Sequence, residues 1–292
     1  MPRLAISREK ILLGLVGALL LACISVWAAV YAATLSGELT FAVLDVGQGD
    51  ALFIESPTGV QVLIDGGPDS SVLRELPKVM GTFDRSIDAV IATHPDADHI
   101  AGLVDVLRRY EVGVFIEPGI PKPTATAKAL EQEVVDEKIP RYIARRGMIL
   151  DLGGGAKLFI LFPDHDVSAL ASNKVNEGGI VARLVYGDAS ALLTADVPKF
   201  VEYQVATLES ENLESDILKI GHHGSRTSTS DILLQSVKPA LALISLGKNN
   251  KFGHPHQEVL ETLARFGVEV LRTDEEGTII FHSSGETFVR EH

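Results

Sequence analysis

The chain has 292 residues, of which 46% are hydrophobic and 22% are charged. This is the composition of an ordinary globular protein, and the length allows one large domain or two smaller ones. The single cysteine, Cys23, excludes an intrachain disulfide framework and a cysteine-based metal site. The formal net charge of -13 argues against tight, nonspecific nucleic-acid binding because it repels the phosphate backbone. An enzyme could still meet phosphodiesters in a local pocket.

Residues 11–35 (ILLGLVGALLLACISVWAAVYAATL) are a run of 25 residues without a charge. A helix needs about 20 apolar residues to cross the hydrocarbon layer, so we predict a transmembrane helix or uncleaved signal anchor here. Three basic residues precede the run, and Glu38 is the first charge after it. The positive-inside rule then places residues 1–10 in the cytoplasm and residues 37–292 outside the cytoplasmic membrane.

A cleaved signal peptide is the alternative, and it would leave a secreted protein. Signal peptides usually have an apolar region of about 7–15 residues, and this run is longer. Val30-Tyr31-Ala32 is nevertheless an acceptable cleavage site. The length of the run therefore favours an anchor, and the lack of a polar face disfavours a buried helix of a soluble protein.

After Gly37 the sequence has the pattern of a single α+β domain without an internal linker. Strands are predicted at 39–45, 51–55 and 60–65, and the short turns between them imply antiparallel neighbours. Further strands are predicted at 87–93, 112–116, 157–162, 179–186, 191–196, 216–220, 240–246 and 268–271, with a terminal hairpin of 278–281 and 287–290. Helices are predicted at 69–80, after His94 through Tyr110, and at 124–138, 198–208, 230–237 and 255–266. This order predicts two sheets packed face to face with helices outside, a four-layer αββα sandwich spanning residues 37–292.

The stretch T-H-P-D-A-D-H-I follows the buried strand 87–93 and contains four potential metal ligands. His94 and Asp96 are alternate residues on an extended or tightly turned segment, so they can point into one pocket. Asp98 and His99 are adjacent at a helix start and could face a second ion. Imidazole and carboxylate groups suit zinc, manganese or iron. Helix capping is the alternative explanation for Asp98.

Two other apolar strands also end in potential ligands. The stretch ALLTAD ends at Asp196, and the stretch DILKIGHHGS contains His222 and His223. Either stretch alone could be an ordinary strand end. Three strand ends that carry histidine or aspartate in one chain together predict a metal site.

The sequence resembles the metallo-β-lactamase-fold hydrolases, and within them the extracytoplasmic hydrolase domain of ComEC-type competence proteins. The motifs that carry the resemblance are LDVGQGDALFIE, VLIDGG, THPDADHIAGL, N-x-x-x-x-V-x-R-L, LLTAD, LKIGHHGS and FGHPH. They extend from about Leu44 to His256 and so cover nearly all of the chain after the apolar segment. The resemblance implies the αββα fold with a two-metal site at one edge of the sandwich.

The resemblance also implies a role for each of these residues. His94 and Asp96 would bind the first metal, Asp98 and His99 the second, and Asp196 would bridge both. One of His222 and His223 would complete the second site, and the sequence leaves both open. Asn176 lies where many zinc members have a further histidine, and it would bind weakly or through water. His165 is expected to face solvent, and Asp45, Asp50 and Asp65 are expected to orient ligands or shape turns.

Two divalent ions, manganese or zinc, could share a hydroxide and stabilise displacement at phosphorus. Asp98 would orient this nucleophile, and His254 would supply a proton or positive charge to the leaving oxygen. The histidine of the 222–223 pair that does not bind metal is a second candidate for this role, and capping of the helix at Pro255 is the alternative for His254. The hydroxyl groups of residues 225–230 (SRTSTS) could bind phosphate or cap a helix.

The first functional hypothesis is a membrane-anchored, extracytoplasmic phosphodiesterase or nuclease. A second is a metal-dependent hydrolase of a lactone, β-lactam or thioester, and a third is a non-catalytic, membrane-anchored binding module with a vestigial site. Asp96 makes the first metal site more anionic than a histidine would. It therefore favours manganese over strict zinc dependence, and phosphodiester over β-lactam substrates.

Overall fold

The computed structural model describes residues 8–34, 37–81, 83–210 and 212–291, with side chains in the first range only through Trp27. The chain divides into two compact units, residues 1–36 and 37–292. The boundary falls where the composition changes in the sequence. Residues 1–7 of the predicted cytoplasmic N-terminus, and residue 35 of the apolar run, lie outside the described residues.

The described residues of the first unit form the helix α1 (Arg8–Thr34). Its part from Arg8 to Trp27 is long and apolar enough to cross a membrane, and the side chains in this part are not buried by protein. Large apolar side chains such as Leu13 and Trp27 are more than two-thirds exposed. A helix with apolar side chains on all faces needs an apolar environment, and this one is the candidate membrane span predicted from the sequence.

The second unit contains two sheets. The first has eight strands, β1 (Leu39–Val43), β2 (Leu52–Glu55), β3 (Gln61–Ile64), β4 (Ser86–Ile91), β5 (Glu111–Glu117), β6 (Arg141–Ile143), β14 (Ile279–Ser283) and β15 (Val289–Arg290), in the order β15-β14-β1-β2-β3-β4-β5-β6. The second has seven, β7 (Ile149–Gly153), β8 (Ala156–Phe162), β9 (Val181–Tyr186), β10 (Ala189–Leu193), β11 (Ile217–Lys219), β12 (Leu241–Ile244) and β13 (Glu269–Arg272), in the order β13-β12-β11-β10-β9-β8-β7.

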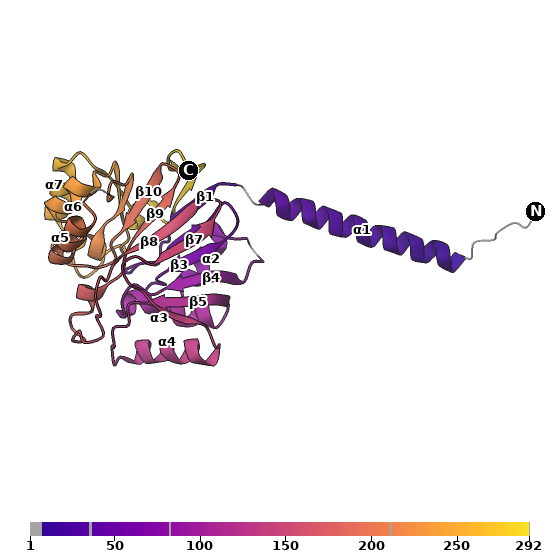
Figure 1. The fold of residues 1–292 in the computed structure, drawn as a ribbon, viewed down its shortest axis with the longest axis horizontal. Coiled ribbons are helices and arrows are strands. Elements are labelled where there is room, and N and C mark those ends of the chain that lie inside the picture. Colours follow the sequence, from indigo (N-terminus) through magenta and orange to yellow (C-terminus); the bar gives the residue numbers. More distant parts are fainter. Residues whose placement is uncertain (1–7, 35–36, 82, 211, 292) are drawn as a thin grey trace, which may run out of the picture. The chain divides into compact units, whose positions relative to one another are not determined.

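Helices cover the outer face of each sheet (Figure 1). The first sheet is covered by α2 (Val72–Val79), α3 (Ala97–Leu107) and α4 (Ala125–Asp136), and the second by α5 (Lys199–Leu208), α6 (Asp231–Val237) and α7 (Gln257–Arg265). Between the sheets lies a buried apolar core that includes Phe41, Leu158 and Leu193. Burial of three apolar layers, one between the sheets and one beneath each helix layer, stabilises the arrangement. The predicted four-layer αββα sandwich is therefore confirmed.

Several local predictions are also confirmed, and others are incomplete. Strands β1, β2 and β3 are antiparallel neighbours, and β14 and β15 form the terminal hairpin. The prediction missed β6, β7 and the one-turn helix α8 (Thr273–Glu276). All three side chains of β6 are exposed, and β7 is at the edge of its sheet. A short, exposed edge strand leaves no run of buried apolar residues in the sequence.

The topology brings the predicted motifs to one edge of the sandwich. Strands β10, β11 and β12 are parallel, so the segments that follow them emerge at the same edge. Strand β4 of the other sheet leads into His94, and a hydrogen bond from the Ile180 N–H to the Thr93 carbonyl oxygen (3.0 Å) joins this end to the second sheet. The carboxyl ends of strands from both sheets thus meet around one site.

Candidate metal centre

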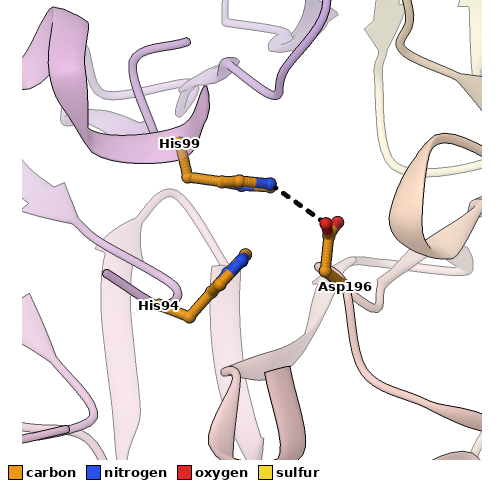
Figure 2. Close-up of side chains that lie close together, drawn as sticks. All are labelled: His94, His99 and Asp196. Carbon is orange, nitrogen blue, oxygen red and sulfur yellow. Dashed lines mark ion pairs between the residues drawn. The ribbon is translucent and has the colours of Figure 1, made fainter. Parts of the chain in front are cut away.

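His94 is a fully buried residue three positions after β4. Its Nδ1 lies 3.0 Å from the Thr93 hydroxyl, which itself donates to Asp65 across 2.6 Å. Because that hydroxyl proton is used, the oxygen accepts from His94 Nδ1–H, and the neutral ring keeps Nε2 as a free acceptor. Figure 2 shows that the His94 ring points toward His99 and Asp196.

His99 is buried in the first turn of α3 and is held between two carboxylates. Its Nδ1 lies 2.7 Å from Asp65 Oδ2, and its Nε2 lies 3.3 Å from Asp196 Oδ2 (Figure 2). Asp65 also accepts from the backbone N–H of Thr93 at 2.7 Å. Asp65 therefore orients one histidine directly and the other through Thr93, as expected for a carboxylate behind metal ligands.

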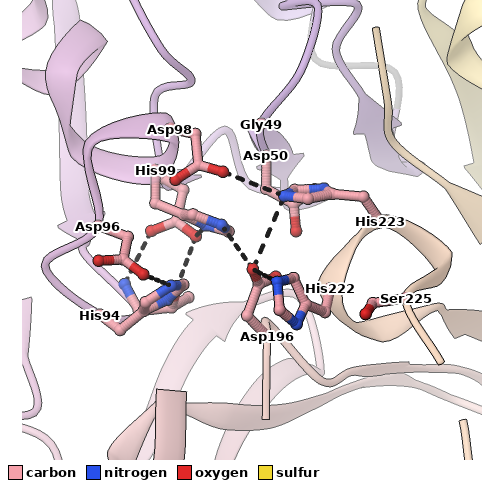
Figure 3. Close-up of polar contacts among 12 residues, drawn as sticks. Gly49, Asp50, His94, Asp96, Asp98, His99, Asp196, His222, His223 and Ser225 are labelled. Atoms are coloured by element: carbon pink, nitrogen blue, oxygen red, sulfur yellow. Dashed lines mark hydrogen bonds and ion pairs between the residues drawn. The ribbon is translucent and has the colours of Figure 1, made fainter. Parts of the chain in front are cut away.

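His223 and His222 occupy very different positions although they are adjacent. Both have positive φ, 51° at His222 and 55° at His223, and this turn sends the two rings in different directions. The buried His223 has Nδ1 3.0 Å from the Ser245 carbonyl oxygen and Nε2 3.4 Å from Asp98 Oδ2. The side chain of His222 is 31% exposed, and its Nδ1 lies 3.0 Å from the Thr227 hydroxyl. Figure 3 shows His223 facing the cluster and His222 at its rim.

Asp196 lies at the centre of the cluster and is almost fully buried. Its Oδ2 is within 3.7 Å of Nε2 in both His222 and His223, besides its contact with His99. This central position suits the bridging role that the family resemblance implies for it. Ala195 before it has a φ of 45°, a strained conformation for a residue with a side chain, and such strain is often found at functional sites.

The two other acidic residues of the motif are at the start of α3. Asp96 is the N-cap residue but makes no side-chain capping bond, and Asp98 faces His223 instead of the backbone. Capping therefore does not explain Asp98. Asp96 Oδ2 lies 3.6 Å from His94 Nε2, and Asp96 Oδ1 is paired with the Lys122 ammonium group. Sequence reasoning did not single out Lys122.

Asp50 lies closer to the cluster than expected. It is buried, and its Oδ2 accepts from Lys219 Nζ at 2.7 Å while its Oδ1 lies 3.4 Å from His223 Nδ1. Lys219 is fully buried in β11 and also donates to the Ile220 carbonyl oxygen at 3.1 Å. A buried charge needs a partner, so the lysine in the apolar strand ILK was a sequence signal for a buried carboxylate.

Burial and neighbouring charges set opposite protonation states for the histidines. Burial lowers the pKa of His223, but Asp196, Asp50 and Asp98 outweigh it and raise that pKa to about 9. Burial also opposes protonation of His99, yet Asp196 and Asp65 raise its pKa well above the usual value.

Burial and the neighbouring His99 lower the pKa of His94 to about 4. Burial would raise the pKa of Asp196, but His99 and His223 lower it well below its usual range.

The donor set fits a divalent metal. Among the described residues, the Nε2 atoms of His94, His99 and His223 and the Oδ1 atoms of Asp50 and Asp196 are buried without a hydrogen-bond partner. His99 and His223 have only ion-pair contacts with Asp196 and Asp98 at these atoms, at 3.3 and 3.4 Å, and buried polar atoms without a hydrogen bond are costly. Three overlapping groups have ligand atoms within 4.8 Å of one another: His94/His99/Asp196, Asp98/His99/His223 and Asp50/Asp196/His223. Imidazole nitrogen and carboxylate oxygen are ligands of zinc, manganese and iron.

The structure places His254 at the rim of this cluster. Its ring centroid lies 5.8 Å from that of His222 and 6.3 Å from that of His223. The N-cap of α7 is His256, so capping does not explain His254. Burial and the neighbouring His223 lower the pKa of His254 to about 4. The ring is therefore neutral near pH 7, and a nearby anion would be needed before it could donate a proton.

The remaining candidates have local structural contacts of their own. Asn176 is in the 3₁₀ turn η1 (Val175–Gly178), and the side chain of His165 is 57% exposed and paired with Asp164. Ser230 caps α6, and the backbone N–H groups of Thr229 and Ser230 donate to Glu202 at 2.6 and 2.7 Å. Within the segment 225–230, Ser230 therefore caps a helix and Glu202 takes the N–H groups of its last two residues, whereas the Thr227 hydroxyl faces His222.

The sequence profile of the metallo-beta-lactamase superfamily matches residues 44–248. The chain is 33% identical over 263 residues to ComE operon protein 3 of Bacillus subtilis (strain 168), covering 84% of this chain and 33% of that protein. It is 30% identical over 241 residues to Recombination protein 2 of Haemophilus influenzae, covering 81% of this chain and 28% of that protein. The chain thus spans about a third of the length of these relatives.

Solved structures show the same fold at low sequence identity. Igni18, a metallo hydrolase from Ignicoccus hospitalis, has a TM-score of 0.54 and 15% identity, covering 83% of this chain and 98% of its own. CmlA, a diiron beta-hydroxylase from Streptomyces venezuelae, has a TM-score of 0.52 and 14% identity, covering 80% of this chain and 52% of its own. With the profile match over most of the chain, this chain belongs to the metallo-beta-lactamase superfamily and has ComEC-type competence proteins among its relatives.

Proposed function

We propose that this chain is a membrane-anchored, extracytoplasmic phosphodiesterase, with a nuclease as the most specific form of that activity, which uses two divalent metal ions. The observation that carries the proposal is the set of buried, unpartnered nitrogen and oxygen atoms around Asp196. Membership of a superfamily of metal-dependent hydrolases supports the general class of reaction.

The first ion would be held by His94, Asp96 and Asp196, and the second by Asp98, His99, His223 and Asp196. His223 is the better ligand of its pair because its Nδ1 is tied to a carbonyl oxygen and its buried Nε2 faces Asp98 and Asp196 without a hydrogen bond. Bound divalent ions would lower the pKa of water and stabilise negative charge at phosphorus.

The protein groups around the ions have separate tasks. Asp65 fixes the ring of His99, and Thr93 fixes the ring of His94. The carbonyl oxygen of Ser245 fixes the ring of His223. Asp98, whose side chain is 37% exposed, can orient the attacking water. His254 lies where it could face the leaving oxygen, and the negative charge of a bound diester would raise its pKa and so favour proton donation.

Phosphodiesters are preferred over β-lactams, lactones and thioesters for two reasons. The first reason is that the site is rich in carboxylate oxygens. Five carboxylates and two ammonium groups surround it (Asp50, Asp65, Asp96, Asp98 and Asp196; Lys122 and Lys219). Oxygen-rich sites suit manganese better than strictly nitrogen-ligated sites do. The second reason is that relatives are named as competence and recombination proteins, which favours nucleic acid over a β-lactam as the proposed substrate.

Membrane attachment is supported by α1 and by the competence-protein relatives. Arg8 and Lys10 lie at the N-terminal end of α1, and the positive-inside rule would leave that end in the cytoplasm. The unit 37–292 would then act on the other side of the membrane.

The full chain in detergent micelles, loaded with manganese or zinc, tests this proposal. The substrates are bis-p-nitrophenyl phosphate, single-stranded DNA and nitrocefin. We expect diester and DNA turnover that a chelator abolishes. Lack of diester turnover with either metal would refute the phosphodiesterase proposal, nitrocefin turnover alone would favour the β-lactam class, and inertness without bound metal would indicate a binding module.

A further inference from the structure

The segment between β12 and α7 forms an ordered loop beside the metal centre. Asn250 holds this loop together: its side-chain nitrogen donates to the carbonyl oxygens of Gly247 and His254, at 3.2 and 2.7 Å. Its side-chain oxygen accepts from the N–H groups of Phe252 and His254, at 3.2 and 3.0 Å. Gly247 N–H also donates to Gln48 Oε1 at 3.1 Å, which ties the loop to the other sheet. The positions of Phe252 and His254 are thus fixed before any ligand binds.

Phe252 presents an aromatic ring to solvent at this rim. The residue is 52% exposed, and its ring stacks on that of His254 with centroids 5.7 Å apart and an interplanar angle of 23°. His254 in turn lies 5.8 Å from His222 and 6.3 Å from His223. The His254 ring therefore lies between Phe252 and the histidines of the metal centre.

Three exposed cationic side chains lie in or beside this loop although the chain has a net charge of -13. Lys251 Nζ lies 5.3 Å from the Phe252 centroid, and Lys248 is exposed in the same loop. Arg226 is exposed beside the loop, where its backbone N–H donates to His256 Nδ1 at 3.3 Å. Within the part of the chain that the structure describes, none of these three side chains has an ion-pair partner, so all are available to phosphate groups.

We propose that Phe252, together with Lys248, Lys251 and Arg226, forms a subsite that stacks an unpaired nucleobase and holds the adjoining phosphates. The inference deepens the proposed phosphodiesterase function and names its substrate class as single-stranded nucleic acid. An exposed aromatic ring can stack on a base only when the base has left the duplex, and it accepts any base because each has a flat π face. The exposed ammonium of Lys251 would exchange its contact with the ring for a phosphate.

Binding of the metal-free full chain, in micelles with a chelator present, tests the subsite without hydrolysis. The probes are fluorescein-labelled oligothymidylate and an abasic strand of the same length, measured by anisotropy at low salt. We expect Phe252→Ala to weaken oligothymidylate binding by about fivefold to a hundredfold, the range given by base–aromatic stacking energies. Abasic-strand binding should be unchanged, and Phe252→Tyr should behave as the wild type.

Phe200 on α5 provides the matched control because it is 56% exposed and lies in another element. Phe200→Ala should leave both affinities unchanged. The double substitution Lys248→Ala and Lys251→Ala should weaken both strands equally and reduce the salt dependence of binding. If Phe252→Ala leaves both affinities unchanged or weakens both equally, or if the wild type binds neither strand, the subsite is wrong.

Turnover of bis-p-nitrophenyl phosphate by the metal-loaded wild type separates this inference from the proposed function. Diester turnover without a Phe252 effect on binding would overturn the subsite alone. A Phe252 effect on binding without diester turnover would support the subsite and refute the hydrolytic function.

Discussion

The Nδ1 atom of His223 lies 3.0 Å from the carbonyl oxygen of Ser245, and this contact distinguishes two adjacent histidines. It turns Nε2 of His223 toward Asp98 and Asp196, at 3.4 and 3.7 Å. His222 instead contacts the Thr227 hydroxyl and remains partly exposed. We therefore propose His223 as the metal ligand of this pair.

We expect His223→Ala to lose one metal ion and His222→Ala to keep both. Supporting partners of metal ligands typically contribute about 10–100-fold in affinity, and loss of a direct ligand costs at least as much. Metal content by mass spectrometry, with dissociation constants from competition with a chelating dye, checks the pair. Equal metal loss in both variants would contradict the assignment of His223.

His254→Ala should keep both metals but lower diester turnover by about 10²–10⁴-fold, the usual contribution of general acid–base catalysis. The reason is that His254 lies at the rim, outside the groups with converging ligand atoms. His165→Ala is the matched control because His165 is exposed and paired with Asp164. Full activity in the His254 variant would show that its assigned role is wrong.

Lys122→Met should strengthen binding of the first metal ion by about tenfold or more. The Lys122 ammonium is paired with Asp96, so it would compete with a cation for that carboxylate. A close pair of unit charges has a Coulomb energy of ~4 kcal/mol at an effective dielectric constant of 20, and about 1.4 kcal/mol of it gives a tenfold change. Isothermal titration calorimetry checks this, with exposed Lys128 in α4 substituted as the control. Unchanged or weaker binding in the Lys122 variant would contradict the competition.

Metal affinity should increase with pH up to about 9. Raised pKa values leave His223 and His99 protonated at pH 7 in the metal-free chain, and a metal binds only the neutral rings. Each displaced proton makes affinity rise about tenfold per pH unit below the pKa of its group. Calorimetry in two buffers with different ionisation enthalpies measures the protons released. Binding without proton release between pH 6.5 and 8.5 would contradict these protonation states.

The core of the fold was predictable because its strands are runs of buried apolar residues, as in β3, β10 and β12. Strand β6 was not, because its three exposed residues owe their extended conformation to pairing with β5. Sheet edges depend on neighbours that are distant in sequence, and local patterns do not record them.

The candidate metal site was also predictable in part from local sequence patterns. Its three motifs could be found because each combines a buried strand with histidine or aspartate at its end. The Asp50–Lys219 pair joins residues 169 positions apart, and Lys122 meets Asp96 across a separation of 26. Only the folded chain brings these charges together, although a lysine within an apolar strand is a local sign of such a partner.

The most direct measurement of the central claim is turnover of single-stranded DNA during titration of the metal-free full chain with manganese. Asp196 lies between the two proposed metal positions, so we expect turnover to develop as two ions bind per chain, and Asp196→Ala to bind neither ion and remain inactive. Full activity with one ion per chain, activity that survives in Asp196→Ala, or no turnover with two ions bound would each contradict a two-metal phosphodiesterase.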